Sequence, residues 1–186
     1  MDWEQAWSRS LPYGEFLARH SEARHQERWQ RMYDQIALRP EERALLATFA
    51  RRMHLLCVAG AWCGDCVLQG PILQHIQEAC PALEVRFIDR DAHPDVQDAL
   101  VLNAGRRVPV VVFLSEDFQE CGRYGDRTLS SYRRMARDRL GPACPTGIVP
   151  PDDEYTAAVT ADWIDEVERI QLMLRLSARL RQKHGD

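Results

Sequence analysis

The chain has 186 residues, of which 45% are hydrophobic and 28% charged, and its formal net charge is −4. This length and composition are typical of a globular protein that buries a core without disulfide staples. The acidic balance leaves no basic footprint for nucleic acid, and no uncharged apolar run is long enough to span a membrane.

The start of the chain carries no positively charged segment followed by an apolar stretch, the pattern of a secretory signal. We therefore expect a cytoplasmic location by default. Because thiols stay reduced in that compartment, the six cysteines are expected to be catalytic, metal-binding or inert rather than structural bridges.

Residues 1–53 are expected to form a helical N-terminal extension. Residues 14–39 carry helical patterning, and the apolar face of this helix consists of His25, Trp29, Met32 and Ile36. Pro40 fits the first turn of a second helix. The arginines outside the apolar face of the first helix, Arg24, Arg28 and Arg31, are interpreted as a solvated surface rather than a binding patch.

Residues 54–140 alternate between strand and helix patterns in the order β-α-β-α-β-β-α. The strands are expected at 54–60, 83–89, 110–114 and, more weakly, 118–124, and the helices at about 64–79, 94–103 and 128–140. Thr128 is the expected N-cap of the last of these helices. Residues 141–186 are expected to add a Pro- and Gly-rich loop and a helix at about 161–181 that packs on this domain.

The chemistry is expected at Trp62-Cys63-Gly64-Asp65-Cys66, between the first strand and the helix that follows it. The free N–H groups and the positive end of that helix would stabilise a thiolate at Cys63. Cys66 comes about one turn later, close enough to attack a mixed disulfide, and Gly64 keeps the turn small.

A Cys-x-x-Cys pair is also half of a zinc site, which needs two further ligands at matching spacing. The sequence has no second such pair and no compact pair of histidines. The remaining cysteines stand singly, at Cys57, Cys80, Cys121 and Cys144. The context of strand, motif and helix therefore favours redox chemistry over zinc binding, with no metal site expected.

The motif and the Pro71-Ile72-Leu73 segment that follows it resemble the W-C-G-x-C-x4-P-I-L segment of the thioredoxin family. The resemblance covers about residues 54–140. It implies a three-layer α/β/α thioredoxin fold with a central mixed sheet, in which Pro71 bends the active-site helix by removing one i→i−4 hydrogen bond. Together with residues 1–53, the chain resembles a bacterial group of thioredoxin-like proteins with W-C-G-D-C motifs and a helical N-terminal extension.

The resemblance also implies roles for individual residues. Cys63 would be the nucleophile and Cys66 the resolving thiol of a redox-active Cys63–Cys66 disulfide, without any cofactor. Val108 and Pro109, the latter as a cis-proline, would form the client-binding surface with Trp62 and with Gly125. The implied partners are proteins that carry disulfides and an external thiol reductant, such as an enzyme of the thioredoxin reductase type.

Two residues depart from the family pattern. Cys57 stands where thioredoxins have a buried Asp that moves the proton of the second cysteine, and a thiol is a weaker proton shuttle. It is either a third redox thiol or an inert buried one. Asp65 replaces the usual Pro, and its charge repels a nearby thiolate, so we expect a Cys63 pKa and a reducing tendency at least as high as those of ordinary thioredoxin.

The predicted function is that of a thiol–disulfide oxidoreductase acting on protein disulfides, with reduction favoured as the direction. One alternative is a glutathione-dependent activity like that of glutaredoxin. Another is a non-catalytic, chaperone-linked binding module that presents the helical extension to a partner. Cys121 and Cys144 leave a regulatory disulfide open.

Overall fold

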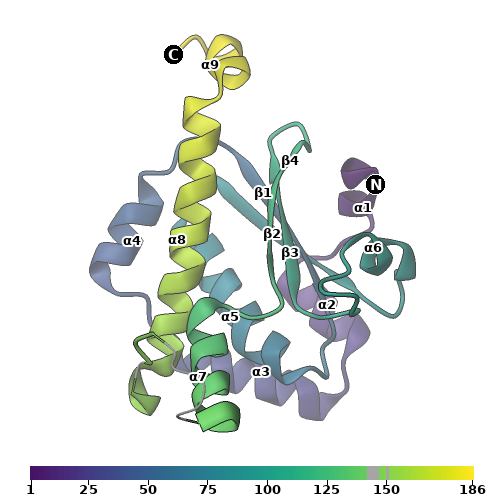
Figure 1. Cartoon of the computed structure of the whole chain (residues 1–186). Coiled ribbons are helices and arrows are strands. Elements are labelled where there is room, and N and C mark those ends of the chain that lie inside the picture. The colour runs from purple at the N-terminus through teal and green to yellow at the C-terminus, as the bar shows by residue number, and fades with distance from the viewer. Residues whose placement is uncertain (142–146, 150) are drawn as a thin grey trace.

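The computed structural model describes residues 1–141, 147–149 and 151–186. In chain order they form α1 (Trp3–Ser8), α2 (Tyr13–His20), α3 (Ala23–Gln35), α4 (Pro40–Ala47), β1 (Met53–Ala59), α5 (Gly64–Ala79), β2 (Leu83–Asp89), α6 (Pro94–Ala99), β3 (Val110–Ser115), β4 (Glu120–Gly125), α7 (Leu129–Leu140), the short 3-10 helix η2 (Asp152–Glu154), α8 (Tyr155–Leu176) and α9 (Ala178–His184) (Figure 1). No helix in these ranges is both long and apolar enough to cross a membrane.

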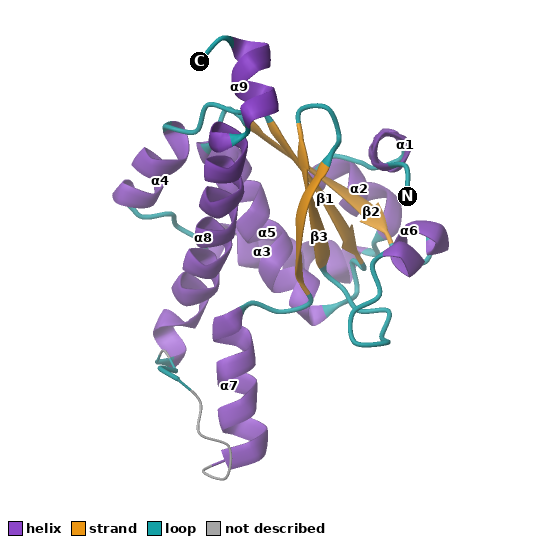
Figure 2. Ribbon diagram, turned by 45° about the horizontal axis from the view of Figure 1, so that its top comes forward, coloured by secondary structure: helices purple, strands orange, loops and turns teal. Residues whose placement is uncertain are grey.

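The described strands form one mixed sheet in the order β2-β1-β3-β4. β1 runs parallel to β2 and antiparallel to β3, and β3 runs antiparallel to β4. Helices α5, α3 and α8 lie on one side of the sheet, and α1 and α6 lie on the other (Figure 2). The expected three-layer arrangement with a central mixed sheet is therefore confirmed.

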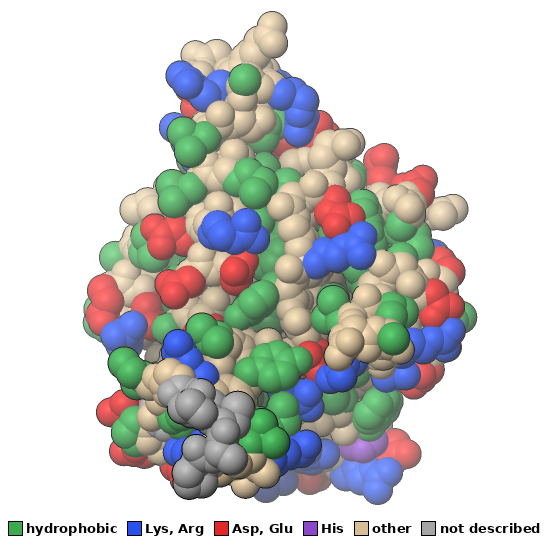
Figure 3. Space-filling view, viewed as in Figure 1, with side chains coloured by type: hydrophobic (Ala, Val, Ile, Leu, Met, Phe, Trp, Pro, Cys, Tyr) green, Lys and Arg blue, Asp and Glu red, His purple; other side chains and the backbone are tan. Residues whose placement is uncertain are grey.

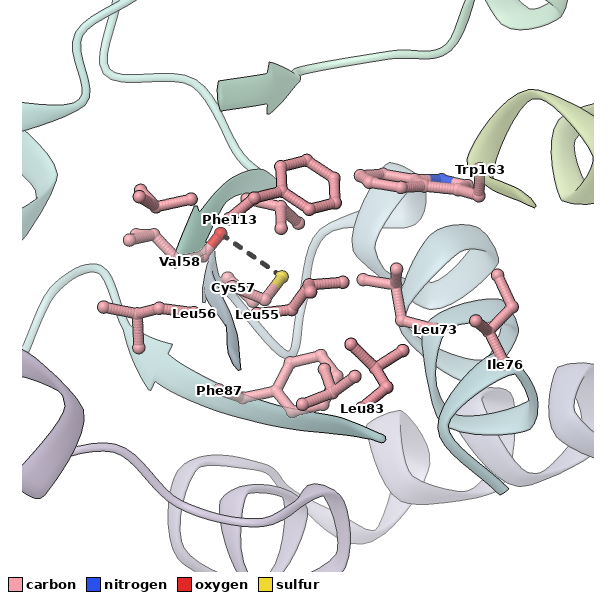
Figure 4. Packing of buried hydrophobic residues seen from close by; sticks show 14 of the residues in the cluster. Leu55, Leu56, Cys57, Val58, Leu73, Ile76, Leu83, Phe87, Phe113 and Trp163 are labelled. Atoms are coloured by element: carbon pink, nitrogen blue, oxygen red, sulfur yellow. Dashed lines mark hydrogen bonds between the residues drawn. The ribbon is translucent and has the colours of Figure 1, made fainter. Parts of the chain in front are cut away.

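The two inner strands, β1 and β3, are buried along their whole length, as expected for strands covered on both faces. Leu55 and Cys57 point toward α5, with Phe87 of β2 beside them (Figure 4). His54, which directly precedes Leu55 in the sequence, lies on the other face and stacks on Phe118, with ring centroids 4.8 Å apart. Because β1 is buried to its end, the motif that follows it begins next to the core of the molecule.

The N-terminal region differs from the single helix expected at 14–39. Ser21 has an extended backbone and ends α2, and its hydroxyl donates to the carbonyl of Leu17 at 2.6 Å. The chain then starts again as α3. A local hydrogen bond of this kind competes with helix continuation, which periodicity alone does not reveal. The helix beginning at Pro40 is confirmed.

The N-terminal helices contribute large side chains to the core. Trp29 of α3 and Phe16 of α2 are fully buried, and both rings pack against Phe87 of β2. Tyr13 packs against the same ring, with centroids 5.8 Å apart. This aromatic cluster joins α2 and α3 to the sheet.

Two other helices have different bounds from those expected. The helix at Pro94 ends at Ala99, because the backbone of Leu100, with φ −119° and ψ 28°, leaves the helical region, and Asn103 and Ala104 then adopt left-handed conformations. The C-terminal helix begins earlier, at Tyr155, and Ser177 interrupts it before α9. Thr128 caps α7 through a bond from the N–H of Ser131, as expected. Part of the expected 141–151 loop lies outside the described residues.

Candidate active site

The Cys63 residue forms the N-cap of α5, directly after the turn that leaves β1. Its N–H donates to the carbonyl of Gly60 at 3.0 Å, which closes this turn. Gly60 is required here because a Cβ atom would lie 2.9 Å from the indole ring of Trp62. The turn therefore places the thiol of Cys63 at the positive end of α5.

The two thiols of the motif have opposite tendencies to ionise. The pKa of Cys63 falls to about 6, mainly because the Cys66 thiol donates to it, against the opposing effect of partial burial. Backbone N–H groups of Cys66 and Asp65 lower the pKa of Cys63 further. Burial raises the pKa of Cys66 well above its usual value, and its bond to Cys63 adds to this. The site thus holds a thiolate on Cys63 and a proton on Cys66.

That the pKa of Cys63 is at least as high as that of ordinary thioredoxin stays a prediction. The charge of Asp65 raises the Cys63 pKa, as expected, but it is the weakest of the influences given above. Its carboxylate forms an ion pair with Arg127 at 2.5 Å, which offsets the charge.

Cys57 lies beneath the site, on the α5 side of β1. Its sulfur is buried and 3.9 Å from the carbonyl oxygen of Val58 (Figure 4). Burial, and then the charge of Cys63, raise the pKa of Cys57. A thiol in this state exchanges no proton at neutral pH, which favours the inert interpretation.

The segment before β3 lies against the nucleophile. The Val108–Pro109 peptide bond is cis, and the Cys63 thiol lies 3.6 Å from the carbonyl oxygen of Val108. Gly125 of β4 lies beside Pro109: a Cβ at Gly125 would be only 2.4 Å from the Pro109 carbonyl oxygen, and its φ is +142°. The structure therefore brings Cys63, Val108, Pro109 and Gly125 together.

Trp62 lies at the rim of this site and is 47% exposed. The guanidinium group of Arg90 covers one side of its ring at 5.6 Å. Pro71 lies inside α5 and is buried, so it is not part of the accessible surface.

Several residues support the site, although the sequence did not predict this role for them. Trp29 donates from its indole N–H to the carbonyl of Ala61 at 2.8 Å, directly before the motif. Gly70 of α5 makes room for the same ring, since a Cβ there would lie 2.1 Å from it. In the sequence, the signal for this close packing was a glycine inside a predicted helix. Arg127 also bridges two carboxylates, those of Asp65 and Asp126.

The other cysteines do not join the motif. Among the described residues, Cys80 and Cys121 are free thiols, and no group of three or more His, Cys, Asp or Glu side chains is placed to hold a metal ion. The expected alternative of a Cys121–Cys144 disulfide involves Cys144, which lies outside the described residues.

A mixed sheet of this order, with two cysteines at the start of the helix after β1, defines a thioredoxin-like protein. Comparison of the sequence with known families agrees, since the family described as Thioredoxin matches residues 11–137. The chain belongs to the thioredoxin family.

Solved structures with the same fold extend over nearly the whole chain. A protein of unknown function from Pseudomonas aeruginosa, PA1234, is 21% identical, with a TM-score of 0.68 over 90% of this chain and 99% of that one. An HIV epitope-scaffold is 20% identical, with a TM-score of 0.65 over 88% of this chain and 98% of that one. At these identities the likeness concerns the fold alone. No curated protein matches the sequence.

Proposed function

We propose that this protein is a thiol–disulfide oxidoreductase that reduces disulfides in proteins through Cys63 and Cys66. The observation that carries the proposal is the contrast between the two thiols. Cys63 has a pKa of about 6 at the start of α5, so it is a thiolate at neutral pH, while burial keeps Cys66 protonated beside it. A nucleophile next to a protonated resolving thiol is what disulfide exchange requires.

In the first step the Cys63 thiolate attacks one sulfur of the client disulfide. A bond forms between Cys63 and the client, and the second client sulfur leaves as a thiolate and takes up a proton. The charge on Cys63, which raises the pKa of Cys66, is then gone. Cys66 loses its proton and attacks the sulfur of Cys63, so that a Cys63–Cys66 disulfide forms and the client leaves with two thiols. The client gains two electrons and two protons.

The client would approach over Trp62, Val108, Pro109 and Gly125. The exposed ring of Trp62 offers an apolar contact, and the backbone of Val108 lies within reach of a client held at Cys63. An extended client segment would pair with that backbone, and Gly125, whose missing side chain makes room for the Pro109 carbonyl, would hold the segment before β3 in place.

Membership of the thioredoxin family suggests how the oxidised protein returns to its dithiol form. An external thiol reductant, such as an enzyme of the thioredoxin reductase type, would restore the dithiol, since the reaction uses two electrons per turnover. We also propose that the protein is cytoplasmic and that it belongs to the thioredoxin-like group with W-C-G-D-C motifs and a helical extension.

The test is reduction of insulin disulfides with dithiothreitol as electron donor. The wild-type protein is expected to accelerate the reaction, and Cys63→Ser to lose at least about a hundredfold of that acceleration, because it removes the nucleophile. Cys66→Ser is expected to accumulate a mixed disulfide between Cys63 and the client, visible by mass spectrometry. Cys121→Ser, which changes a thiol outside the site, serves as the control.

If the wild-type protein is no faster than dithiothreitol alone, and Cys66→Ser traps no client, the proposed function is wrong. The binding-module alternative predicts both of these results.

A further inference from the structure

A groove lies between α3 and α5 and opens beside the nucleophile. Its volume is about 320 Å³, and it is called the α3–α5 groove below. Arg28 and Arg31 of α3 line it together with Met32, and α5 contributes Gly64, Val67 and Leu68. The groove therefore combines an apolar strip with two guanidinium groups.

The α3–α5 groove begins one residue away from the reacting cysteine. Gly64, at one end of the groove, is the residue directly after Cys63. It is exposed and has no side chain, and a Cβ built on it would lie 4.0 Å from the nearest guanidinium nitrogen of Arg28. A client segment bound at Cys63 can thus continue past Gly64 into the groove without meeting a side chain at that position.

The two arginines carry charge that the described part of the protein does not neutralise. Arg24, one turn earlier on α3, is paired with Glu22 at 2.9 Å. For Arg28 and Arg31, by contrast, residues 1–141, 147–149 and 151–186 provide no carboxylate within ion-pair distance.

Two of the nearby carboxylates, those of Asp65 and Asp34, have other partners, and Glu27, four residues before Arg31 on α3, is exposed and lies outside ion-pair distance of both arginines. Asp65, the acidic residue closest to Cys63 in the sequence, is bound to Arg127. Asp34 accepts a hydrogen bond from Gln30 on the same helix. Acidic and basic side chains are interspersed over the molecular face seen in Figure 3, so positive charge on this protein is a local feature. A protein with a net charge of −4 therefore presents local positive charge beside its reactive thiol.

We propose that the α3–α5 groove binds an acidic segment of the client, adjacent to the cysteine that Cys63 attacks. The inference rests on the proposed function and adds its substrate preference. Carboxylates of the segment pair with Arg28 and Arg31, and its apolar atoms cover Met32 and Leu68. These arginines are exposed, as expected, and the proposal gives Arg28 and Arg31 a role in specificity.

The test compares two cyclic peptides of equal length, each closed by one disulfide. One carries Glu residues on both sides of each cysteine, and the other carries Gln at the same positions. Reduced protein is mixed with each peptide in a single-turnover reaction, and the second-order rate constant is divided by that of dithiothreitol with the same peptide. This division removes the intrinsic effect of the neighbouring charges on the disulfide.

For the wild-type protein we expect the normalised rate constant to be about fivefold higher for the Glu peptide, the effect of two exposed charge pairs. The preference should shrink in 1 M salt, where such pairs are screened. The double variant Arg28→Glu/Arg31→Glu should invert the preference, so that the Gln peptide reacts faster. Because both peptides react with the same thiol, a change in the Cys63 pKa would leave the ratio unaltered.

Arg52→Glu is the control. Arg52 is exposed and precedes β1 at the end opposite to the motif, so its reversal lowers the net charge by two, against four in the double variant, and should leave the ratio as in the wild type. Equal normalised rate constants for the two peptides in the wild type would refute binding of an acidic segment in the α3–α5 groove. A preference for the Glu peptide that persists in the double variant would refute it as well. Neither result would contradict the redox function. If neither peptide is reduced, the proposed function itself fails.

Discussion

At the scale of single residues, the pKa of Cys63 depends on groups near it in the sequence and on one cation that lies far from it along the chain. The Cys66 thiol and two backbone N–H groups lower its pKa, and Asp65 raises it. Arg127, which follows β4, is 2.5 Å from the Asp65 carboxylate and so reduces the repulsion. The replacement of the family's Pro by Asp is therefore accompanied by a compensating cation.

We expect alkylation of Cys63 by iodoacetamide to report this balance. The reaction requires the thiolate, so its rate should rise with pH, reach half its maximum near pH 6 and level off above the pKa. Arg127→Met leaves Asp65 unpaired and should move the midpoint upward by about half a unit. The rate is measured by peptide mass spectrometry on the reduced protein.

The control is the double variant Arg127→Met/Asp65→Asn. If Arg127 acts through Asp65, its removal should have little effect once the carboxylate is gone. An equal upward shift in both backgrounds would show that the ion pair does not tune Cys63.

At the scale of elements, contact between α3 and α5 holds the turn that carries the motif. Trp29 reaches from α3 across Gly70 of α5, and its indole N–H donates to Ala61. The ring is buried and its one donor is satisfied, as a tryptophan in a core requires. The extension therefore supports the backbone immediately before Cys63.

Gly70→Ala is expected to lower the free energy of unfolding by about 2 kcal/mol, because the new Cβ would overlap with the ring of Trp29. Gly14→Ala is the matched control: Gly14 lies in α2 with nothing within 4 Å of its Cβ position, so alanine should be neutral or slightly stabilising there. Urea unfolding measures both. Equal effects of the two variants would contradict the close approach of α3 and α5.

At the scale of the whole molecule, the helical N-terminal region shares one core with the sheet. The family match begins at residue 11, well before β1. Trp29, Phe16 and Phe87 form part of a single buried cluster. The division at residue 53 therefore separates sequence patterns, and we predict that it does not separate units that fold independently.

A chain that starts at residue 54 is expected to lose cooperative urea unfolding, since it would expose Phe87 and the surface of α5 that Trp29 covers. A chain that ends at residue 176 loses α9, in which Leu180 is the buried side chain, and the Asp186 carboxylate that pairs with Arg51, and should still unfold cooperatively. Circular dichroism follows both transitions. A cooperative transition in the first variant would establish residues 1–53 as a separate unit.

The sequence by itself determined the order of the central elements and the position of the motif. β2 has the predicted bounds, because alternating apolar residues between turn signals are a local pattern. The same holds for α5, which begins directly after Cys63 and ends where Cys80 and Pro81 follow. The interruptions at Ser21 and Ser177 were missed, since apolar periodicity continues across each of them.

The tertiary structure decided the electrostatics and the support of the candidate site. Nothing in the sequence pairs Asp65 with Arg127, 62 residues later, or Trp29 with Ala61. Such contacts depend on how the helices cross the sheet, and a charge influences a thiol through its distance in space rather than along the chain. The sequence thus identified the two reacting sulfurs, whereas only the folded chain determined the pKa of Cys63 and the arginines beside it.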